Sequence, residues 1–173
     1  MSEYHNWQTA MARSRLSAPV RILLDRELIE GEVLDFGCGR GDDVRFLSEM
    51  TNLTVVGWDP HWCPHGIHIH LGQTMGAARA LETPNYKTIL CTYVLNVVPP
   101  LAQMEIVREV VRLLGKGGAA FFTVRRDIPQ EGTDTQWWVK QEMFDESLKG
   151  TGYQAYPVHA VLNKYDIYMV EEI

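Results

Sequence analysis

Apolar and polar positions along the chain follow two patterns, which predict strands and helices. Short runs of apolar and β-branched residues are typical of strands, because these side chains pack well on a pleated surface. Apolar residues three and four positions apart are typical of amphipathic helices. We expect strands at residues 32–36, 54–58, 67–71, 87–95, 119–124, 153–162 and 165–171, and helices at residues 19–29, 42–50, 74–81, 100–114 and 139–148.

The order of these elements predicts an α/β fold. Strands and helices alternate over most of the chain, which is typical of a Rossmann-like sheet with helices on both faces. The last two strands are joined by Asn163 and Lys164, which is a hairpin signal. We therefore expect a seven-stranded, mostly parallel sheet with a C-terminal antiparallel hairpin. Residues 1–30 are expected to form a helical arm or lid, and residues 31–173 one domain.

A glycine-rich turn follows the first predicted strand. Asp35 precedes Gly37, Gly39 and Gly41, which stand at alternate positions. Glycine suits a place where the backbone comes close to a ligand and adopts a positive φ. In an open α/β sheet, the mouth of such a turn is where a nucleotide-like ligand binds.

The spacing of the glycines distinguishes between nucleotide ligands. A dinucleotide fingerprint has the form G-x-G-x-x-G/A, and its last position, counted from Gly37, is Asp42. The chain has the pattern D-x-G-x-G-x-G instead, which disfavours a nicotinamide-dependent enzyme. Asp42 or Asp43 is expected to cap the helix that follows.

A second acidic residue ends the next predicted strand. Asp59 lies about 20 residues beyond the turn, where an acid in this kind of fold can accept hydrogen bonds from both hydroxyls of a ribose. The alternative is a simple Asp-Pro turn, because Pro60 follows directly. Together with the glycine-rich turn, the position favours the ribose role.

The D-x-G-x-G-x-G pattern resembles motif I of the class I S-adenosylmethionine-dependent methyltransferases. The terminal hairpin, and the sequence Leu-Leu-x-x-Gly-Gly from Leu113 to Gly118 before a strand, are also similar to that family. The resemblance implies a class I methyltransferase domain that binds S-adenosylmethionine as its cofactor. The cofactor-binding residues that it implies are Asp35, Phe36, Gly37, Cys38, Gly39, Gly41, Asp59, Pro60, Thr92 and Tyr93.

Four blocks of the chain resemble a narrower group within these methyltransferases. The blocks are Thr9–Arg21, Asp35–Val44, Gly57–Pro60 and Tyr93–Val97. They are similar to methyltransferase-like proteins named for their neighbourhood to DNA phosphorothioation genes. That name reflects genome context and implies no substrate, but it strengthens the case that the Arg-Ser-Arg-Leu-Ser sequence of the first block belongs to the site.

Basic residues at the expected carboxyl edge of the sheet are candidates for binding the acceptor. Arg125 and Arg126 follow the strand over residues 119–124, and arginines there can bind a phosphate or a carboxylate bidentately. A solvated loop is the alternative for this pair. Arg13 and Arg15 in the arm are further substrate-binding candidates, with solvated charge on a helix as their alternative.

A few residues are candidates for a catalytic role. Asn96 is expected nearest to the transfer site, because it follows the strand over residues 87–95. Tyr93, Asp127 and His61 are weaker candidates for a general base, which is required only for a protonated acceptor. The [DNS]-P-P-[FYW] motif of amino-methyltransferases is absent, because two valines separate Asn96 from Pro99.

The segment from His61 to His70 contains four histidines and one cysteine. Histidine and cysteine are the usual ligands of zinc, so a metal site is one interpretation. Their spacing matches no structural zinc pattern, and a half-exposed strand explains the alternation of His68 and His70 with isoleucine equally well. We therefore expect no metal.

Composition narrows the remaining possibilities. The net charge of −6 argues against a broad basic surface, so nucleic acid is a possible partner that the charge does not support. The three cysteines form no disulfide framework, and no apolar run reaches the ~20 residues of a membrane span, so we expect a cytoplasmic protein with no membrane contact. The expected function is methyl transfer to a small or nucleotide-like acceptor, for which the arginines favour a phosphate. Alternatives are a non-catalytic cofactor-binding subunit or transfer of another group of the same cofactor, and the oligomeric state is left open.

Overall fold

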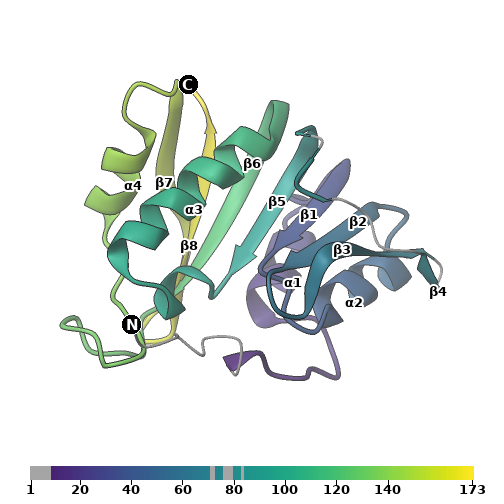
Figure 1. Cartoon of the computed structure of the whole chain (residues 1–173), viewed down its shortest axis with the longest axis horizontal. Coiled ribbons are helices and arrows are strands. Elements are labelled where there is room, and N and C mark those ends of the chain that lie inside the picture. Colours follow the sequence, from purple (N-terminus) through teal and green to yellow (C-terminus); the bar gives the residue numbers. More distant parts are fainter. Residues whose placement is uncertain (1–8, 71–72, 76–79, 83) are drawn as a thin grey trace.

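The computed structural model describes residues 9–70, 73–75, 80–82 and 84–173. These residues form an eight-stranded sheet in the order β4-β3-β2-β1-β5-β6-β8-β7, with helices packed against it (Figure 1). The strands are β1 (Glu32–Phe36), β2 (Thr54–Asp59), β3 (Cys63–His70), β4 (Gln73–Met75), β5 (Tyr86–Thr92), β6 (Leu114–Arg125), β7 (Tyr153–Val161) and β8 (Tyr165–Glu172). The helices are α1 (Ala18–Asp25), α2 (Asp42–Met50), α3 (Pro100–Leu113) and α4 (Gln141–Leu148), with a short 3-10 helix, η2 (Leu95–Val97), after β5.

The central strands are buried on both faces. Successive side chains of a strand point to opposite sides, so Leu34 lies in one core and Val33 in the other. Helices α3 and α4 cover the first core, where the fully buried Phe144 packs on Phe122 with ring centroids 5.4 Å apart. Helices α1 and α2 cover the second core, to which α1 contributes Leu23. Helices therefore lie on both faces of the sheet, as the sequence predicts (Figure 1).

The sheet is mixed, so the expectation of a mostly parallel sheet is wrong. Strand β1 is parallel to β2 and β5, and β5 is parallel to β6. The pairs β2–β3, β3–β4, β6–β8 and β7–β8 are antiparallel. The seven expected strands are present, with β4 as a short addition at the edge, and the C-terminal hairpin of β7 and β8 is confirmed.

Loop length explains why β3 runs opposite to β2. Only the segment Pro60–Trp62 connects Asp59, the end of β2, to Cys63, the start of β3. A parallel neighbour requires a crossover of about a dozen residues or more, whereas a hairpin requires only a few. The short connection therefore returns the chain antiparallel to β2.

Strand β4 replaces the start of the helix expected over residues 74–81. Gln73 pairs with His70 and Met75 pairs with His68, so the backbone of this segment extends the edge of the sheet. Tertiary pairing of this kind overrides a weak helical preference. Residues 76–79 of the expected helix lie outside the described part of the chain, and residues 80–82 form a turn.

Other predicted boundaries also differ from the structure, among them those of α1, β5 and β6. Helix α1 ends at Asp25 instead of residue 29, and Glu27 beyond it has a left-handed φ of 58°. Strand β5 ends at Thr92 instead of residue 95, because Tyr93 has a φ of 63° and leaves the extended conformation. Strand β6 begins earlier than expected, at Leu114.

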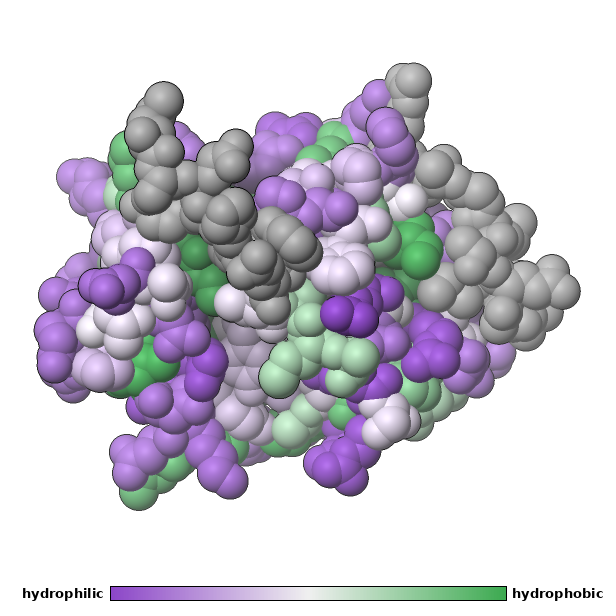
Figure 2. Space-filling model, turned by 60° about the horizontal axis from the view of Figure 1, so that its bottom comes forward, coloured by the Kyte–Doolittle hydropathy of each residue, from purple (hydrophilic) through white to green (hydrophobic). Residues whose placement is uncertain are grey.

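The parallel strands β1, β2, β5 and β6 all end at the same edge of the sheet (Figure 1). The arm lies along this edge, where the side chain of Arg40 donates a hydrogen bond of 3.4 Å to the carbonyl oxygen of Ala10. Figure 2 turns this end of the molecule forward and shows small hydrophobic patches separated by hydrophilic residues. None of the helices within the described ranges is long and apolar enough to cross a membrane.

Candidate active site

A cavity of about 680 Å³ lies at the edge where the parallel strands end. Its lining includes the last residue of each of these strands, namely Phe36, Asp59, Thr92 and Arg125. The other predicted cofactor residues that line it are Gly37, Cys38, Gly39, Pro60 and Tyr93, and Arg13 and Asp127 line it as well. The candidates that do not line it are Asp35, Gly41, Arg15, Asn96 and Arg126.

The backbone of the turn after β1 requires glycine. Gly37 has a φ of 77°, and a Cβ atom there would lie 2.4 Å from Cγ2 of Val94. The N–H groups of Gly37 and Cys38 both donate to the carbonyl oxygen of Trp58, at 2.7 and 3.0 Å. These bonds hold the turn against the end of β2. Because Val94 lies so close, there is no room for a side chain at Gly37.

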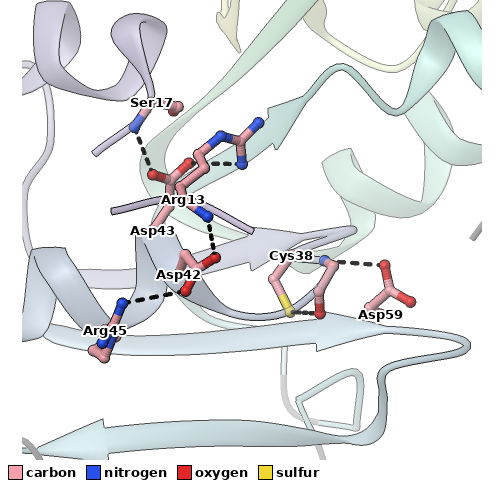
Figure 3. A network of polar contacts seen from close by, with 8 residues as sticks. Arg13, Ser17, Cys38, Asp42, Asp43, Arg45 and Asp59 are labelled. Atoms are coloured by element: carbon pink, nitrogen blue, oxygen red, sulfur yellow. Dashed lines mark hydrogen bonds and ion pairs between the residues drawn. The ribbon is translucent and has the colours of Figure 1, made fainter. Parts of the chain in front are cut away.

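Asp59 connects the turn to the segment that follows β2 (Figure 3). Its Oδ2 atom accepts a hydrogen bond of 3.1 Å from the N–H of Gly39. Its Oδ1 atom accepts from the N–H groups of His61 and Trp62, at 2.9 and 3.0 Å. A carboxylate has about four acceptor positions, so one remains for a ligand hydroxyl. Asp59 therefore builds a turn, and its role toward a ribose stays a prediction.

The two aspartates at the start of α2 bind the arm and do not cap the helix. Gly41, with a φ of 78°, is the N-cap of α2, so the expected capping by Asp42 or Asp43 is wrong. Asp42 accepts a hydrogen bond of 2.7 Å from the backbone N–H of Arg13, and Asp43 accepts one of 2.8 Å from that of Ser17 (Figure 3). The guanidinium of Arg13 also lies 3.9 Å from Asp43.

Asp35 is buried at the end of β1, with 4% of its surface exposed. Burial raises the pKa of its carboxyl well above the ordinary value, and the nearby carboxylate of Asp43 raises it further, whereas Arg13 lowers it. Ionisation of Asp35 therefore costs free energy in the ligand-free protein. A cationic ligand group close to Asp35 would offset that cost.

Tyr93 lies at the end of β5 in a left-handed conformation, with a φ of 63°. Its N–H donates a hydrogen bond of 2.9 Å to the carbonyl oxygen of Thr123, and its ring meets that of Tyr165 edge to face at 6.2 Å. Burial, followed by the effect of Tyr165, raises the pKa of Tyr93 to about 12. The hydroxyl therefore stays protonated near neutral pH and is suited to donate a hydrogen bond.

Arg125 and Asp127 form a bidentate ion pair beside the cavity. The Nε atom of Arg125 lies 2.8 Å from Oδ1 of Asp127, and its second nitrogen lies 2.7 Å from Oδ2. This hydrogen bonding lowers the pKa of Asp127. Lys164 lines the same cavity, and within the described part of the chain its ammonium forms no ion pair.

Asn96 and Arg126 have structural contacts outside the cavity. Asn96 is fully buried; its Nδ2 donates to the carbonyl oxygen of Trp137 at 2.9 Å, and its Oδ1 accepts from the N–H of Arg125 at 2.6 Å. Arg126 pairs with Asp166 and lies 4.5 Å above the ring of Trp138. Arg15 is exposed and also lies outside the cavity lining.

Several lining residues were not among the sequence candidates. Lys164 and Tyr165 come from the β7–β8 hairpin, and Gln136 comes from the segment before α4. The hairpin signal at Asn163 and Lys164 was visible in the sequence, but the placement of its turn beside the cavity depends on the pairing of β8 with β6. Apolar lining is provided by Val94, Val97, Val98 and Ile106.

Metal ligation was the other interpretation of the segment His61–His70. Within the described residues, no group of three or more His, Cys, Asp or Glu side chains is placed to bind a metal ion. The side chain of His70 lies outside the described part of the structure.

Comparison with known proteins defines the class. A family model described as a methyltransferase domain matches residues 8–159, so the chain belongs to the methyltransferase domain family and the methyltransferase expectation is confirmed. No curated protein matches the chain. The narrower resemblance to the phosphorothioation-associated group stays a prediction.

Solved structures share the fold at low sequence identity. A SAM-dependent methyltransferase from Bacteroides fragilis in complex with S-adenosyl-L-homocysteine is 15% identical, with a TM-score of 0.65, over 92% of this chain and 79% of its own. Magnesium protoporphyrin IX methyltransferase from Synechocystis PCC 6803 with bound SAH is 14% identical, with a TM-score of 0.63, over 98% and 94%. The [4+2]-cyclase SpnF is also similar, with a TM-score of 0.57, 14% identity and coverage of 89% and 79%.

We predict that Gly37→Ala destabilises the protein more than Gly150→Ala. Gly37 and Gly150 have φ values of 77° and 75°, so both alanines bear a left-handed strain of about 1–2 kcal/mol. Only the Cβ at residue 37 meets Val94, whereas nothing lies within 4 Å of the Cβ at residue 150. Gly37→Ala should therefore lower the free energy of unfolding by about 1–3 kcal/mol more than Gly150→Ala, because of overpacking. Urea denaturation of both variants measures this excess. Equal losses would contradict the close approach, and Val94→Ala should restore part of the excess.

We predict that Asp35→Asn stabilises the ligand-free protein and that the gain grows with pH. The pKa of Asp35 is raised in the folded protein, so the folded state binds this proton more tightly than the unfolded state. The wild type therefore loses stability as the pH rises from about 4, the ordinary Asp value, through the raised pKa. Asparagine does not titrate and avoids this loss.

Urea denaturation at about pH 5 and about pH 8 measures the effect of Asp35→Asn. Asp145→Asn, on the exposed side of α4, is the matched control. A difference between wild type and Asp35→Asn that does not change with pH would contradict the prediction.

Proposed function

We propose that the protein transfers a methyl group from S-adenosylmethionine to a small or nucleotide-like acceptor that carries an anionic group such as a phosphate. The observation that carries the proposal is one continuous cavity with two kinds of lining. The glycine turn and Asp59 line it together with the basic side chains of Arg125 and Lys164. One ligand that requires close backbone approach and a second that requires positive charge can therefore meet in the same space.

The residues of the turn fit S-adenosylmethionine. A Cβ atom at Gly37 would fill the space beside Val94, and the same atom at Gly39 would lie 3.1 Å from Cβ of Ala10. Asp59 retains an acceptor position for a ribose hydroxyl. When bound, this cofactor supplies a methyl group on a sulfonium, which is already activated for transfer.

The protein's own contribution is mainly orientation of the acceptor. Tyr93 offers a protonated hydroxyl, because its pKa is raised to about 12. Asp127 is a weaker base than an ordinary aspartate, since its hydrogen bonds with Arg125 lower its pKa. We therefore assign Asp127 the task of orienting Arg125. Asn96 is a positioning residue, because its amide fixes the backbone of Arg125 and Trp137.

Charge and size favour a small anionic acceptor. Arg13, Arg125 and Lys164 line the cavity, and the ammonium of Lys164 is available because it has no ion pair in the described part of the chain. A nucleic acid is less favoured, because the protein carries a net charge of −6. Resemblance to phosphorothioation-associated proteins adds no information on the acceptor.

Two alternatives use the same cofactor site. The chain can act as a non-catalytic partner subunit, or it can transfer another group of the same cofactor. The structural similarity to SpnF, which is named as a [4+2]-cyclase, shows that this fold also occurs in a protein named for another reaction. Mass analysis of products separates these outcomes, because only methyl transfer adds one methyl group to the acceptor and leaves S-adenosylhomocysteine.

We predict that Asp59→Ala weakens the binding of S-adenosylhomocysteine at least tenfold, or about 1.4 kcal/mol. The substitution removes the proposed ribose acceptor and releases the N–H groups of Gly39, His61 and Trp62. Isothermal calorimetry measures the affinity, and urea denaturation confirms that the variant is folded. Asp145→Ala, at an exposed position of α4, should bind as the wild type does. Unchanged affinity in Asp59→Ala would refute the ribose role of Asp59.

We predict that Lys164→Gln raises the KM for an acidic acceptor about tenfold and leaves kcat nearly unchanged. The ammonium of Lys164 is expected to bind the acceptor equally well in the ground state and in the transition state. Its removal therefore raises KM and leaves kcat unchanged. Candidate acceptors are supplied as pairs that differ only in one acidic group, with S-adenosylhomocysteine formation as the readout. Lys149→Gln, at the exposed end of α4, is the control. An equal response to both members of each pair would contradict the anionic acceptor.

A further inference from the structure

Two thiols lie against the glycine turn, both close to the same carbonyl oxygen. The sulfur of Cys38 lies 3.7 Å from the carbonyl oxygen of Gly39, and the sulfur of Cys63 lies 3.9 Å from the same oxygen. Each thiol shifts the pKa of the other, which places the two sulfurs close together. Figure 3 shows the sulfur of Cys38 beside the carbonyl oxygen of the turn, whose N–H group is bonded to Asp59.

Secondary structure places the two cysteines on either side of the end of β2. The N–H of Cys38 donates to the carbonyl oxygen of Trp58, and Cys63 is the antiparallel partner of Asp59. Cys38 belongs to the turn, and Cys63 begins β3. The two cysteines are 25 positions apart in the chain. They lie close together because the glycine turn and β3 both bind the end of β2.

The two thiols differ in reactivity. Cys63 is half-buried, and its pKa is lowered because the hydrogen bond from Cys38 favours the thiolate. Cys38 lines the cavity, and the same hydrogen bond together with burial raises its pKa. Cys91 is fully buried, and burial raises its pKa well above the ordinary value. Since the thiolate is the reactive form, Cys63 is the most reactive of the three.

We propose that Cys38 and Cys63 form a reversible disulfide that closes the cofactor site when the protein meets a hydroperoxide. The Cys63 thiolate attacks one peroxide oxygen, the O–O bond breaks, and Cys63 becomes a sulfenic acid while the other oxygen leaves as hydroxide. The sulfur of Cys38 then attacks the Cys63 sulfur, the S–O bond breaks, and the sulfenic oxygen leaves as water with the proton of Cys38. Two thiols lose two electrons, and one hydrogen peroxide becomes two waters.

The disulfide would act on the cofactor site through the backbone. A disulfide has a bond length of about 2.0 Å, so the two sulfurs must approach each other and leave the carbonyl group of Gly39. Cys38 and Gly39 are adjacent in the turn, and the N–H of Gly39 is bound to Asp59. Movement of the sulfurs therefore strains the bond between the turn and Asp59, on which the cofactor half of the cavity depends.

This inference goes beyond the proposed function, because it concerns thiol chemistry that does not need methyl transfer. Thermodynamic linkage between the two sites is reciprocal. If the disulfide weakens the binding of S-adenosylhomocysteine by some factor, bound S-adenosylhomocysteine disfavours formation of the disulfide by the same factor.

The test treats the full-length protein with hydrogen peroxide and maps its cysteines by mass spectrometry. We expect one intramolecular Cys38–Cys63 bond, with Cys91 still a thiol. Calorimetry should show at least tenfold weaker binding of S-adenosylhomocysteine, which dithiothreitol reverses. Cys63→Ser should bind as the reduced wild type does and keep its affinity after peroxide. Amide hydrogen exchange at Gly39, His61 and Trp62 should increase on oxidation, a readout that needs no cofactor.

Each opposite result overturns the proposal. A sulfinic acid at Cys63 without a bond to Cys38, or a disulfide between two molecules, would exclude the pair as a modification site. A mapped Cys38–Cys63 bond with unchanged amide exchange would exclude its effect on the site. If the reduced protein fails to bind S-adenosylhomocysteine at all, the proposed function fails. Cysteine mapping and amide exchange still show whether the disulfide forms and whether it alters the turn.

Discussion

The carboxylate of Asp59 is the interaction on which the cofactor half of the cavity depends. It accepts backbone N–H groups from Gly39 on one side and from His61 and Trp62 on the other. Charge-assisted hydrogen bonds of this kind are stronger than neutral ones. The same residue ends β2, whose short connection to β3 reverses the chain. The proposed ligand hydroxyl would therefore meet a carboxylate that the fold has already oriented.

Two buried acidic residues are a second constraint, and the N-terminal arm provides polar groups that bind one of them. Asp35 and Asp43 are both buried near the turn, with 4% of each residue's surface exposed. The arm supplies the backbone N–H of Ser17 and the guanidinium of Arg13, which compensate Asp43. Asp35 has no such compensation of comparable size, since its pKa remains raised. Ionisation of Asp35 is therefore unfavourable in the ligand-free protein, and the arm does not remove that cost.

The sequence correctly predicted the elements that depend on residues close together in the chain. Strand β1, helix α2 and the β7–β8 hairpin lie where alternation, helical spacing and the turn residues at Asn163 and Lys164 placed them. The direction of β3 and the existence of β4 depend on which strand edge is within reach of a short loop, as for Pro60–Trp62. Such pairing is a property of the assembled sheet, so hydrophobic periodicity does not reveal it.

The candidate site divides in the same way. The residues of the glycine turn are contiguous in a motif, whereas the rest of the cavity lining comes from strand ends that are distant in the chain, so Lys164 reaches the cavity only because β8 pairs with β6. Arg125 and Arg126 show why charge alone was insufficient. Arg125 is the last residue of β6 and borders the cavity, whereas Arg126, directly after the strand, packs between Asp166 and Trp138. Two neighbouring arginines thus have different surroundings, and of the two only Arg125 contributes charge to the cavity.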